Sequence, residues 1–286
     1  LFYLFKLQLS MKKLYKLLRV EHYIKNFIIF APLLFTTRLE NTTNILNVFQ
    51  IFVIFCILAS IVYIFNDIVD IKADKLHPKK KQSKPLASGL INLEYAKLVI
   101  FCLVIFLVIL LYFFPKFIEL SLIYILLNIA YSYLLKNIFL IDILSLSLNY
   151  LIRVYAGCVA LDVNLSNWMA VTIFSGALSI SSIKRERELF LYGHKARKVL
   201  KNYGDKILKI ITILTSILSA AFYTFYVIFT NERIFLTIPL IIYAIFRFTY
   251  RSRSKEFTDS PVEEILKDKQ NYLIIFFWLI IVIFYT

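Results

Sequence analysis

The sequence predicts an all-α, polytopic membrane protein with about nine transmembrane helices, and composition and charge are the observations that lead there. Of its 286 residues, 60% are hydrophobic, and the mean hydropathy is +0.75. Charged residues make up only 18%, whereas soluble domains carry roughly 25%. Even so, 33 Lys and Arg residues against 18 Asp and Glu residues give a net charge of +15. This composition excludes a disordered chain, a disulfide-rich secreted module, a typical soluble enzyme and a nucleic-acid-binding domain.

Apolar runs of about 20 residues, long enough to cross the hydrocarbon core as helices, recur along the chain. Before them, residues 1–22 mix basic and apolar side chains, and we expect a basic amphipathic segment on the membrane surface. Residues 23–286 are then expected to form one transmembrane domain. The predicted spans cover residues 23–37, 47–65, 94–114, 117–135, 138–160, 166–183, 208–230, 233–250 and 271–285.

The connections between these spans differ in charge. Lys and Arg residues are concentrated in residues 66–93, 184–207 and 251–270, which alternate with connections that hold almost no basic side chain. The positive-inside rule therefore places the N-terminus in the cytoplasm and the C-terminus outside. We expect an integral protein of a prokaryotic plasma membrane, with the lipid bilayer around it and the polar site on the cytoplasmic side. A homo-oligomer is compatible with the sequence.

The strongest polar motif follows the second predicted span directly and begins at Asn66. If the helix continues, Asp67, Asp70 and Asp74 fall at i, i+3 and i+7 and share one face. Three carboxylates on one face repel one another and need a counter-charge. Mg²⁺ suits them, because it takes a few carboxylates together with substrate phosphates, and Asn66 adds a neutral oxygen ligand. The alternative is a solvated, acidic helix end.

Two basic segments accompany this motif. The first, residues 77–89, carries Lys80 and Lys84 between Pro78 and Gly89, and lysines beside a carboxylate–Mg²⁺ cluster form a phosphate-binding mouth. Taken alone, the same lysines fit a contact with anionic lipid. The second segment, residues 184–188, reads Lys-Arg-Glu-Arg-Glu at the end of the sixth span. A self-paired helix end is the alternative interpretation there.

These motifs resemble the UbiA superfamily of intramembrane prenyltransferases, whose first motif is similar to the pattern from Asn66 to Asp74. The usual second aspartate pair of aromatic prenyltransferases is missing. The segment that stands in its place resembles the decaprenyl-phosphate phosphoribosyltransferase branch, as do three other places in the chain. The matching residues, within residues 19–285, are Arg19, Lys25 and Asn26; Lys136, Asp142, Arg153 and Gly157; Lys184, Arg185 and Glu188; and Arg197, Leu200 and Tyr203. Val20, His22, Tyr23 and Lys84 depart from that branch, and Lys84 cannot make the bidentate phosphate contact of an Arg.

The resemblance implies nine helices around a central cavity open to the cytoplasmic side. It also implies a Mg²⁺-dependent transfer of 5-phosphoribosyl from phosphoribosyl pyrophosphate to a polyprenyl phosphate, which releases pyrophosphate. Asp67, Asp70 and Asp74 would be the catalytic, metal-holding carboxylates, with Asn66 beside them. The candidate substrate- and phosphate-binding residues are Lys25, Asn26, Asn66, Lys80, Lys84, Lys136, Arg153, Lys184, Arg185 and Glu188. Arg153 lies deep in its predicted span, so a structural ion pair or a snorkelling side chain is equally compatible with it.

Two rival functions share part of this pattern. A UbiA-type prenyltransferase that transfers a prenyl group from a prenyl diphosphate to an aromatic or lipid acceptor would use the same first motif, but the missing second aspartate pair argues against it. A transporter or lipid flippase would place charged residues near the middle of the membrane and often shows internal repeats. Here only Arg153 lies deep, and no clear repeat is visible.

Overall fold

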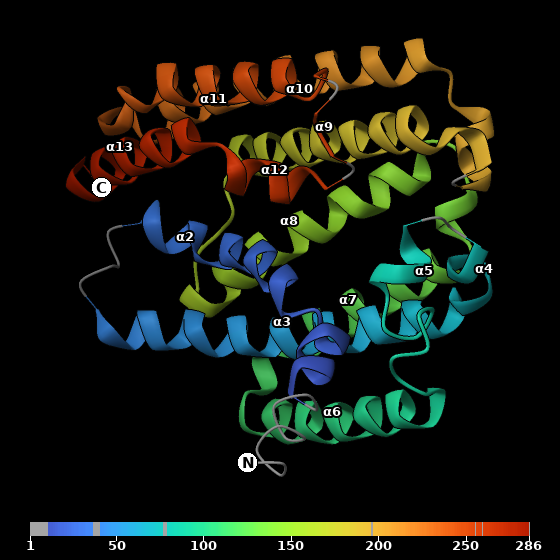
Figure 1. Cartoon of the computed structure of the whole chain (residues 1–286). Coiled ribbons are helices and arrows are strands. Elements are labelled where there is room, and N and C mark those ends of the chain that lie inside the picture. The colour runs from blue at the N-terminus through green and yellow to red at the C-terminus, as the bar shows by residue number, and fades with distance from the viewer. Residues whose placement is uncertain are drawn as a thin grey trace, which may run out of the picture. The chain divides into compact units, whose positions relative to one another are not determined.

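The computed structural model describes residues 11–36, 41–76, 79–195, 197–254, 256–258 and 260–285. Within these ranges every regular element is a helix (Figure 1), which confirms the all-α prediction. Residues 1–10, His77 and Pro78 lie outside the described residues, and the side chain of Lys80 is not described. The chain divides into two compact units, Leu1–Ile29 with Leu46–Tyr133, and Phe30–Ile45 with Leu134–Thr286.

The first unit is built on α3 (Thr42–Val69), a long apolar helix without Gly or Pro. The loop after α5, the start of α6 and the residues before η1 pack against α3 through buried Leu17, Ile64, Leu86, Ile91 and Ala96. Since these side chains come from four separate stretches, this core fixes the polar loop against the end of α3. The other elements of this unit are η1 (Val20–Phe30), α4 (Ile71–Leu76), α5 (Lys80–Ser83), α6 (Leu93–Phe113), η2 (Pro115–Phe117) and α7 (Ile118–Tyr133).

The second unit contains the remaining helices. In Figure 1, α9 (Asn167–Tyr192) lies between α8 (Ile141–Leu161) and α10 (Asp205–Thr230), and it packs against both. A buried cluster with Met169, Tyr223 and Ile234 closes one end of this bundle. The other elements are α2 (Ala31–Leu34), η3 (Leu135–Asn137), η4 (Gly193–Lys195), η5 (Lys198–Asn202), η6 (Glu232–Ile234), α11 (Thr237–Arg251), α12 (Pro261–Lys267) and α13 (Lys269–Tyr285).

Small polar side chains bring α9 and α10 close together. The hydroxyls of Ser179 and Ser216 are hydrogen-bonded at 2.7 Å, and the Ser219 hydroxyl donates to the Thr172 carbonyl at 3.1 Å. Gly176 leaves so little room that a Cβ there would lie 3.0 Å from Ser219 Oγ. In lipid the hydrophobic effect does not drive helices together, so helices associate through small residues and hydroxyl hydrogen bonds of this kind.

Among the described residues, four helices are long and apolar enough to cross a membrane: Thr42–Val69, Leu93–Phe113, Ile141–Leu161 and Lys206–Thr230. They correspond to the predicted spans 47–65, 94–114, 138–160 and 208–230. The Leu93–Phe113 helix is only 11% buried, so its apolar side chains are placed to face lipid. The predicted first span, residues 23–37, is instead a 3₁₀ segment, η1, followed by the single turn of α2. Neither the 3₁₀ segment nor the single turn of α2 is long enough to cross the membrane as one continuous α-helix.

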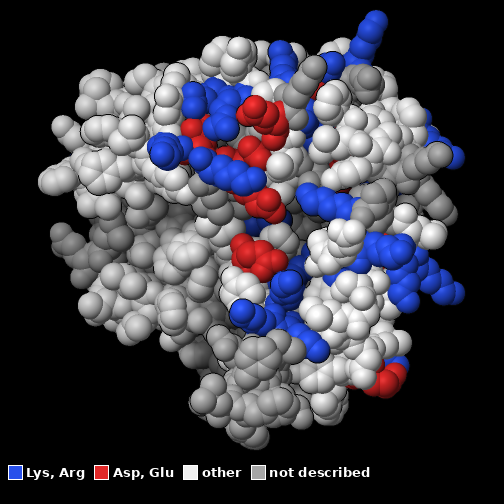
Figure 2. All heavy atoms as spheres, viewed as in Figure 1, with Lys and Arg blue, Asp and Glu red and all other residues white. Residues whose placement is uncertain are grey.

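Charged side chains gather in patches. Figure 2 shows Lys and Arg close to Asp and Glu in these patches, while broad areas of the same face carry neither sign of charge. Polar residues are therefore grouped with their counter-charges rather than scattered over the apolar helices, as a membrane protein requires.

The contact at Gly176 predicts a coupled effect on stability. We expect Gly176→Ala to lower the melting temperature, by roughly 1 kcal/mol of stability, because the added methyl crowds Ser219 Oγ. In a Ser219→Ala background the same change should cost clearly less. Gly204→Ala is the control, because a Cβ at Gly204 would meet nothing within 4 Å. Equal losses in both backgrounds, measured by thermal unfolding in detergent, would contradict this close packing.

Candidate active site

The acidic motif lies where α3 passes into α4 in the first unit. The Asp70 amide donates to the Asn66 carbonyl at 2.9 Å, and the Asp74 amide donates to the Asp70 carbonyl at 2.8 Å. These i to i−4 bonds carry the helical path across the junction. The predicted helical path is therefore kept with one interruption, since α3 ends at Val69 and α4 begins at Ile71, and Asp67, Asp70 and Asp74 stay close to helical spacing.

Two of these carboxylates share one lysine. Lys84 Nζ lies 2.9 Å from Asp67 Oδ1 and 2.5 Å from Asp74 Oδ2, and Arg19 Nη2 lies 2.6 Å from the same Asp67 oxygen. The side chains of Asp67 and Asp74 are 1% and 5% exposed, whereas Lys84 is 16% exposed. We call Arg19, Asp67, Asp74 and Lys84 the first ion cluster. Charges buried this deeply are tolerated only when they are paired.

A tight loop holds Lys84 in this cluster. The Ser88 amide donates to the Lys84 carbonyl at 2.9 Å, and Gly89, at a φ of 75°, supplies the left-handed turn that reverses the chain. Leu86 and Ile91, on either side of that turn, are buried in the core of the first unit. The backbone of Lys84 is therefore fixed, and only its side chain has freedom to move.

The donor set around Asp67 is suited to a divalent metal. Asp67 Oδ2 is buried and accepts no hydrogen bond, so one carboxylate oxygen keeps its ligand capacity. Asn66, beside it, accepts a hydrogen bond from the Ser132 hydroxyl. In the described residues, however, no three His, Cys, Asp or Glu side chains are gathered closely enough to hold a metal together. Lys84 lies between Asp67 and Asp74, and Arg19 contacts Asp67. Carboxylate and amide oxygens of this type are the ligands that Mg²⁺ prefers.

A second buried network occupies α8, α9 and the segment after α9 in the second unit. Arg185 Nε donates to Asp142 Oδ2 at 2.6 Å, and Arg185 Nη1 donates to Glu188 Oε2 at 2.6 Å. Arg197 Nε lies 2.9 Å from the same Glu188 oxygen. The Arg185 side chain is 1% exposed. We call Asp142, Arg185, Glu188, Arg197 and Tyr203 the second ion cluster.

Tyr203 fastens this second cluster to the start of α8. Its hydroxyl donates to Asp142 Oδ1 at 2.5 Å and accepts from the Leu140 amide at 2.9 Å. Leu140 has a φ of 62°, which a branched side chain rarely adopts, so the surrounding bonds must hold it there. Burial, and then the hydrogen bond with Asp142, raise the pKa of Tyr203 above its ordinary value.

Four residues in these clusters were not among the predicted site residues. Arg19, Asp142, Arg197 and Tyr203 entered the sequence prediction only as parts of matching patterns, with no role assigned to them. Arg19 and Tyr203 contact carboxylates far away along the chain, and Arg185 contacts distant Asp142, so no local spacing could have assigned these pairings. The available signal was the place of these residues in the matching patterns, namely the segment that begins at Arg19, the stretch from Lys136 to Gly157, and Arg197-x-x-Leu200-x-x-Tyr203.

The structure places the remaining predicted residues outside the two clusters. Asn26 is buried and donates to Cys56 Sγ at 3.4 Å, with half-buried Lys25 beside it. Arg153 is 4% exposed and donates to the Asn149 carbonyl at 2.7 Å, one turn earlier on α8. The other predicted residues that are half-buried are Asn66, Asp70, Lys136 and Lys184.

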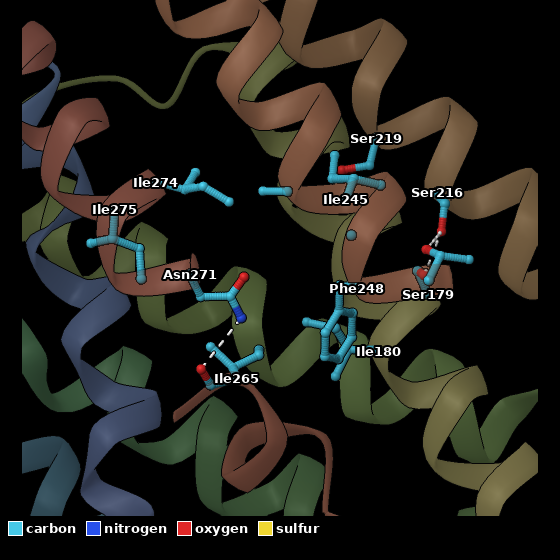
Figure 3. A pocket seen from close by; sticks show the side chains of 13 residues that line it. Ser179, Ile180, Ser216, Ser219, Ile245, Phe248, Ile265, Asn271, Ile274 and Ile275 are labelled. Atoms are coloured by element: carbon cyan, nitrogen blue, oxygen red, sulfur yellow. Dashed lines mark hydrogen bonds between the residues drawn. The ribbon is translucent and has the colours of Figure 1, made fainter. Parts of the chain in front are cut away.

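A separate apolar pocket of about 220 Å³ lies within the second unit, lined by α9, α10, α11, α12 and α13. Figure 3 shows Ile180, Ile245, Phe248 and Ile274 around it, with Asn271 and the Ser179–Ser216 pair at its edge. On α9 its wall lies on the face of Gly176 and Ile180, whereas Arg185 lies nearly half a turn away around the helix. An apolar pocket on another face of the helix is no phosphate site.

The two clusters offer complementary chemistry. The first combines buried carboxylates with basic side chains, which suits a metal–phosphate ligand. In the second, Asp142 and Glu188 are both paired with Arg185, so the cluster offers no open carboxylate pair for a second metal.

The chain matches known proteins in sequence and in fold. The model of the UbiA prenyltransferase family matches residues 27–280. A decaprenyl-phosphate phosphoribosyltransferase from Mycolicibacterium smegmatis is 34% identical over 162 residues, which are 55% of this chain and 51% of that protein. The protein of the same name from Corynebacterium glutamicum is 28% identical over 204 residues, which are 68% of this chain and 61% of that protein.

The fold agrees with this match. The solved structure of a UbiA homolog from Archaeoglobus fulgidus, bound to DMAPP and Mg²⁺, has a TM-score of 0.72, with 96% of this chain and 100% of that chain covered at 16% identity. At that identity the likeness concerns the fold alone. The chain spans about half to three-fifths of the length of the curated relatives it matches. Since the family model covers most of its residues, the chain belongs to the UbiA prenyltransferase family.

Proposed function

We propose that this protein transfers 5-phosphoribosyl from phosphoribosyl pyrophosphate to a polyprenyl phosphate in the membrane. The products are phosphoribosyl-phospho-polyprenol and pyrophosphate. The observation that carries the proposal is the second ion cluster, where Arg185 engages both available carboxylates, Asp142 and Glu188. Arg185 is 1% exposed and held between both acids, so these carboxylates are closed to a second metal, whereas Lys84 of the first ion cluster is 16% exposed on a flexible stem. The names of the relatives from M. smegmatis and C. glutamicum support the same reaction.

The first ion cluster is assigned to the diphosphate of the sugar donor. Asp67, Asp70 and Asp74 would hold Mg²⁺, with Asn66 as a neutral ligand. When bound, the ion would neutralise the diphosphate as it leaves. The fold neighbour from A. fulgidus was solved with Mg²⁺, which supports a metal in this family. Lys80 and Lys84, on the loop beside the acidic motif, supply positive charge for the phosphate oxygens.

The reaction breaks the bond between C1 of the ribose and the diphosphate oxygen, and forms a bond from C1 to an oxygen of the polyprenyl phosphate. Positive charge develops on the ribose as the first bond breaks. The attacking phosphate is already anionic, so no strong general base is needed. Catalysis then consists of positioning and electrostatic stabilisation, which basic side chains on a rigid scaffold provide.

The second ion cluster is assigned to phosphate recognition. Arg185 is buried between Asp142 and Glu188, so it fixes the shape of the cluster. Lys184 is half-buried and Arg197 is 23% exposed, so both are more accessible to a ligand than Arg185. Lys25, Asn26, Lys136 and Arg153 remain candidate phosphate-binding residues. We propose the cytoplasmic side of the plasma membrane for the site, because the basic connections set the topology.

A direct experiment tests the reaction. Membranes that contain the protein are supplied with labelled phosphoribosyl pyrophosphate and polyprenyl phosphate, and the lipid fraction is analysed by mass spectrometry. We expect a labelled lipid with the mass of phosphoribosyl-phospho-polyprenol, and its loss when a chelator removes Mg²⁺. The proposal is wrong if no such lipid forms while a prenyl diphosphate yields a prenylated product.

The acidic motif yields a prediction for activity. Asp67→Asn should lower the transfer rate at least about a hundredfold, because it weakens the charge that holds the metal and the departing diphosphate. Glu94→Gln is the matched control, since Glu94 is exposed and pairs only with nearby Lys97 on the surface. Equal rates in the two variants, measured with the labelled-lipid assay at equal protein levels, would remove Asp67 from the site.

Tyr203 yields a prediction for the effect of pH on stability. Its pKa is raised in the folded protein, so the neutral phenol stabilises the fold below pH about 10 and this contribution is lost as the pH rises further. In Tyr203→Phe the extra loss of stability above pH about 10 should vanish, and at neutral pH the variant should be less stable by about 1–2 kcal/mol. Melting curves of both proteins across alkaline pH check this. Parallel curves would show that Tyr203 ionises freely.

A further inference from the structure

Lys84 occupies the position between the two most deeply buried carboxylates of the acidic motif. Its Nζ contacts Asp67 at 2.9 Å and Asp74 at 2.5 Å, so one ammonium group bridges oxygens that the proposed metal would also use. The inference below rests on the proposed Mg²⁺ site. It concerns what this lysine does when no metal is bound.

Charge balance explains why a cation must lie between Asp67 and Asp74. Asp67 and Asp74 are almost completely buried, and two buried carboxylates without counter-ions would be strongly destabilising. Lys84 and Arg19 together supply two positive charges to this pair. A divalent ion between the same carboxylates would supply that charge by itself and would repel a neighbouring ammonium group.

The two cations differ in their freedom to move. The Arg19 guanidinium lies 5.3 Å from the centre of the Tyr63 ring, so the ring also holds it. Lys84 has a four-carbon flexible stem on a backbone that the Ser88 and Gly89 turn fixes. Displacing its side chain requires no change in the fold. Asp67 Oδ2, buried without a hydrogen bond, is a ready oxygen for the incoming ion.

We propose that the Lys84 ammonium group occupies the metal position when no metal is bound and leaves it when Mg²⁺ binds with diphosphate. We call this exchange the handover. Mg²⁺ displaces the ammonium group from Asp67 and Asp74, and the released Nζ then donates hydrogen bonds to diphosphate oxygens. The same lysine therefore opposes metal alone and favours metal with diphosphate. Binding of the two ligands is cooperative as a result, and the protein keeps its carboxylates neutralised at every stage.

One test uses the unaltered protein. Purified protein in detergent is treated with a limiting amine-acetylating reagent, and acetylation of Lys84 is measured by mass spectrometry relative to Lys97, an exposed lysine paired with Glu94. Mg²⁺ alone at high concentration should raise the acetylation of Lys84 about threefold or more, and added pyrophosphate should lower it again. The Lys97 signal should stay constant. Unchanged or reduced acetylation of Lys84 with Mg²⁺ would overturn the proposal.

A second test measures metal affinity without any reaction. Mn²⁺ binding is followed by electron paramagnetic resonance for the wild type, Lys84→Met, and Lys97→Met as matched control. Lys84→Met should bind Mn²⁺ alone about tenfold more tightly than the wild type and lose most of the gain that pyrophosphate gives. If Lys84→Met is unstable without metal, its melting temperature should rise with Mg²⁺ far more than that of the wild type.

The outcomes separate this proposal from the proposed function. If Lys84→Met binds Mn²⁺ no more tightly than the wild type while the wild type makes labelled lipid, the handover is wrong and the function stands. If neither protein binds Mn²⁺, both the handover and the metal site are wrong. If Mn²⁺ binds as expected and no phosphoribosyl lipid forms, the handover stands and the assigned reaction is wrong.

Discussion

The structure depends on one electrostatic constraint: an apolar chain can bury a charge only beside its opposite. Asp67 and Asp74 in the first unit, and Asp142 and Glu188 in the second, are nearly inaccessible to water. Each is contacted by Lys or Arg at hydrogen-bonding distance. The long helices, the tight turn at Gly89 and the strained backbone at Leu140 keep the paired acidic and basic side chains next to one another. Elsewhere the long helices are mainly apolar, and buried Arg153 on α8 is an exception that donates to a backbone carbonyl.

This constraint also links structure to chemistry. Replacing a buried ion pair with apolar residues often costs no stability, so evolution has little structural reason to keep one. A cluster with an exchangeable cation is useful when the ligands are phosphates and a divalent metal. The metal can replace the side-chain cation at the carboxylates, and the released cation can bind phosphate, so no buried charge is left unpaired. The two clusters differ in this respect. Lys84 has a long flexible side chain and is 16% exposed, whereas Arg185 is 1% exposed and lies between two acids.

Much of the fold followed from the sequence, because span length and helical spacing are local properties. The four long apolar helices and the helical spacing of Asp67, Asp70 and Asp74 were predicted in this way. The first span was not, since residues 20–34 carry enough apolar character for a helix but fold as 3₁₀ turns and one short helix. The pairings of Arg19 with Asp67 and of Tyr203 with Asp142 could not be predicted, because they join residues 48 and 61 positions apart. The nine-helix count and the central cavity stay predictions.

The central claim is that the buried ion pairs serve ligand binding rather than stability. The paired neutral variant Asp74→Leu/Lys84→Met removes both members of one pair at once, so no uncompensated charge remains between them. The melting temperature of this variant and its yield of labelled phosphoribosyl lipid are measured together on the same preparation. The account predicts a melting temperature at or above that of the wild type and a yield at least about a hundredfold lower. A variant that melts far below the wild type yet transfers phosphoribosyl at the wild-type rate would contradict it.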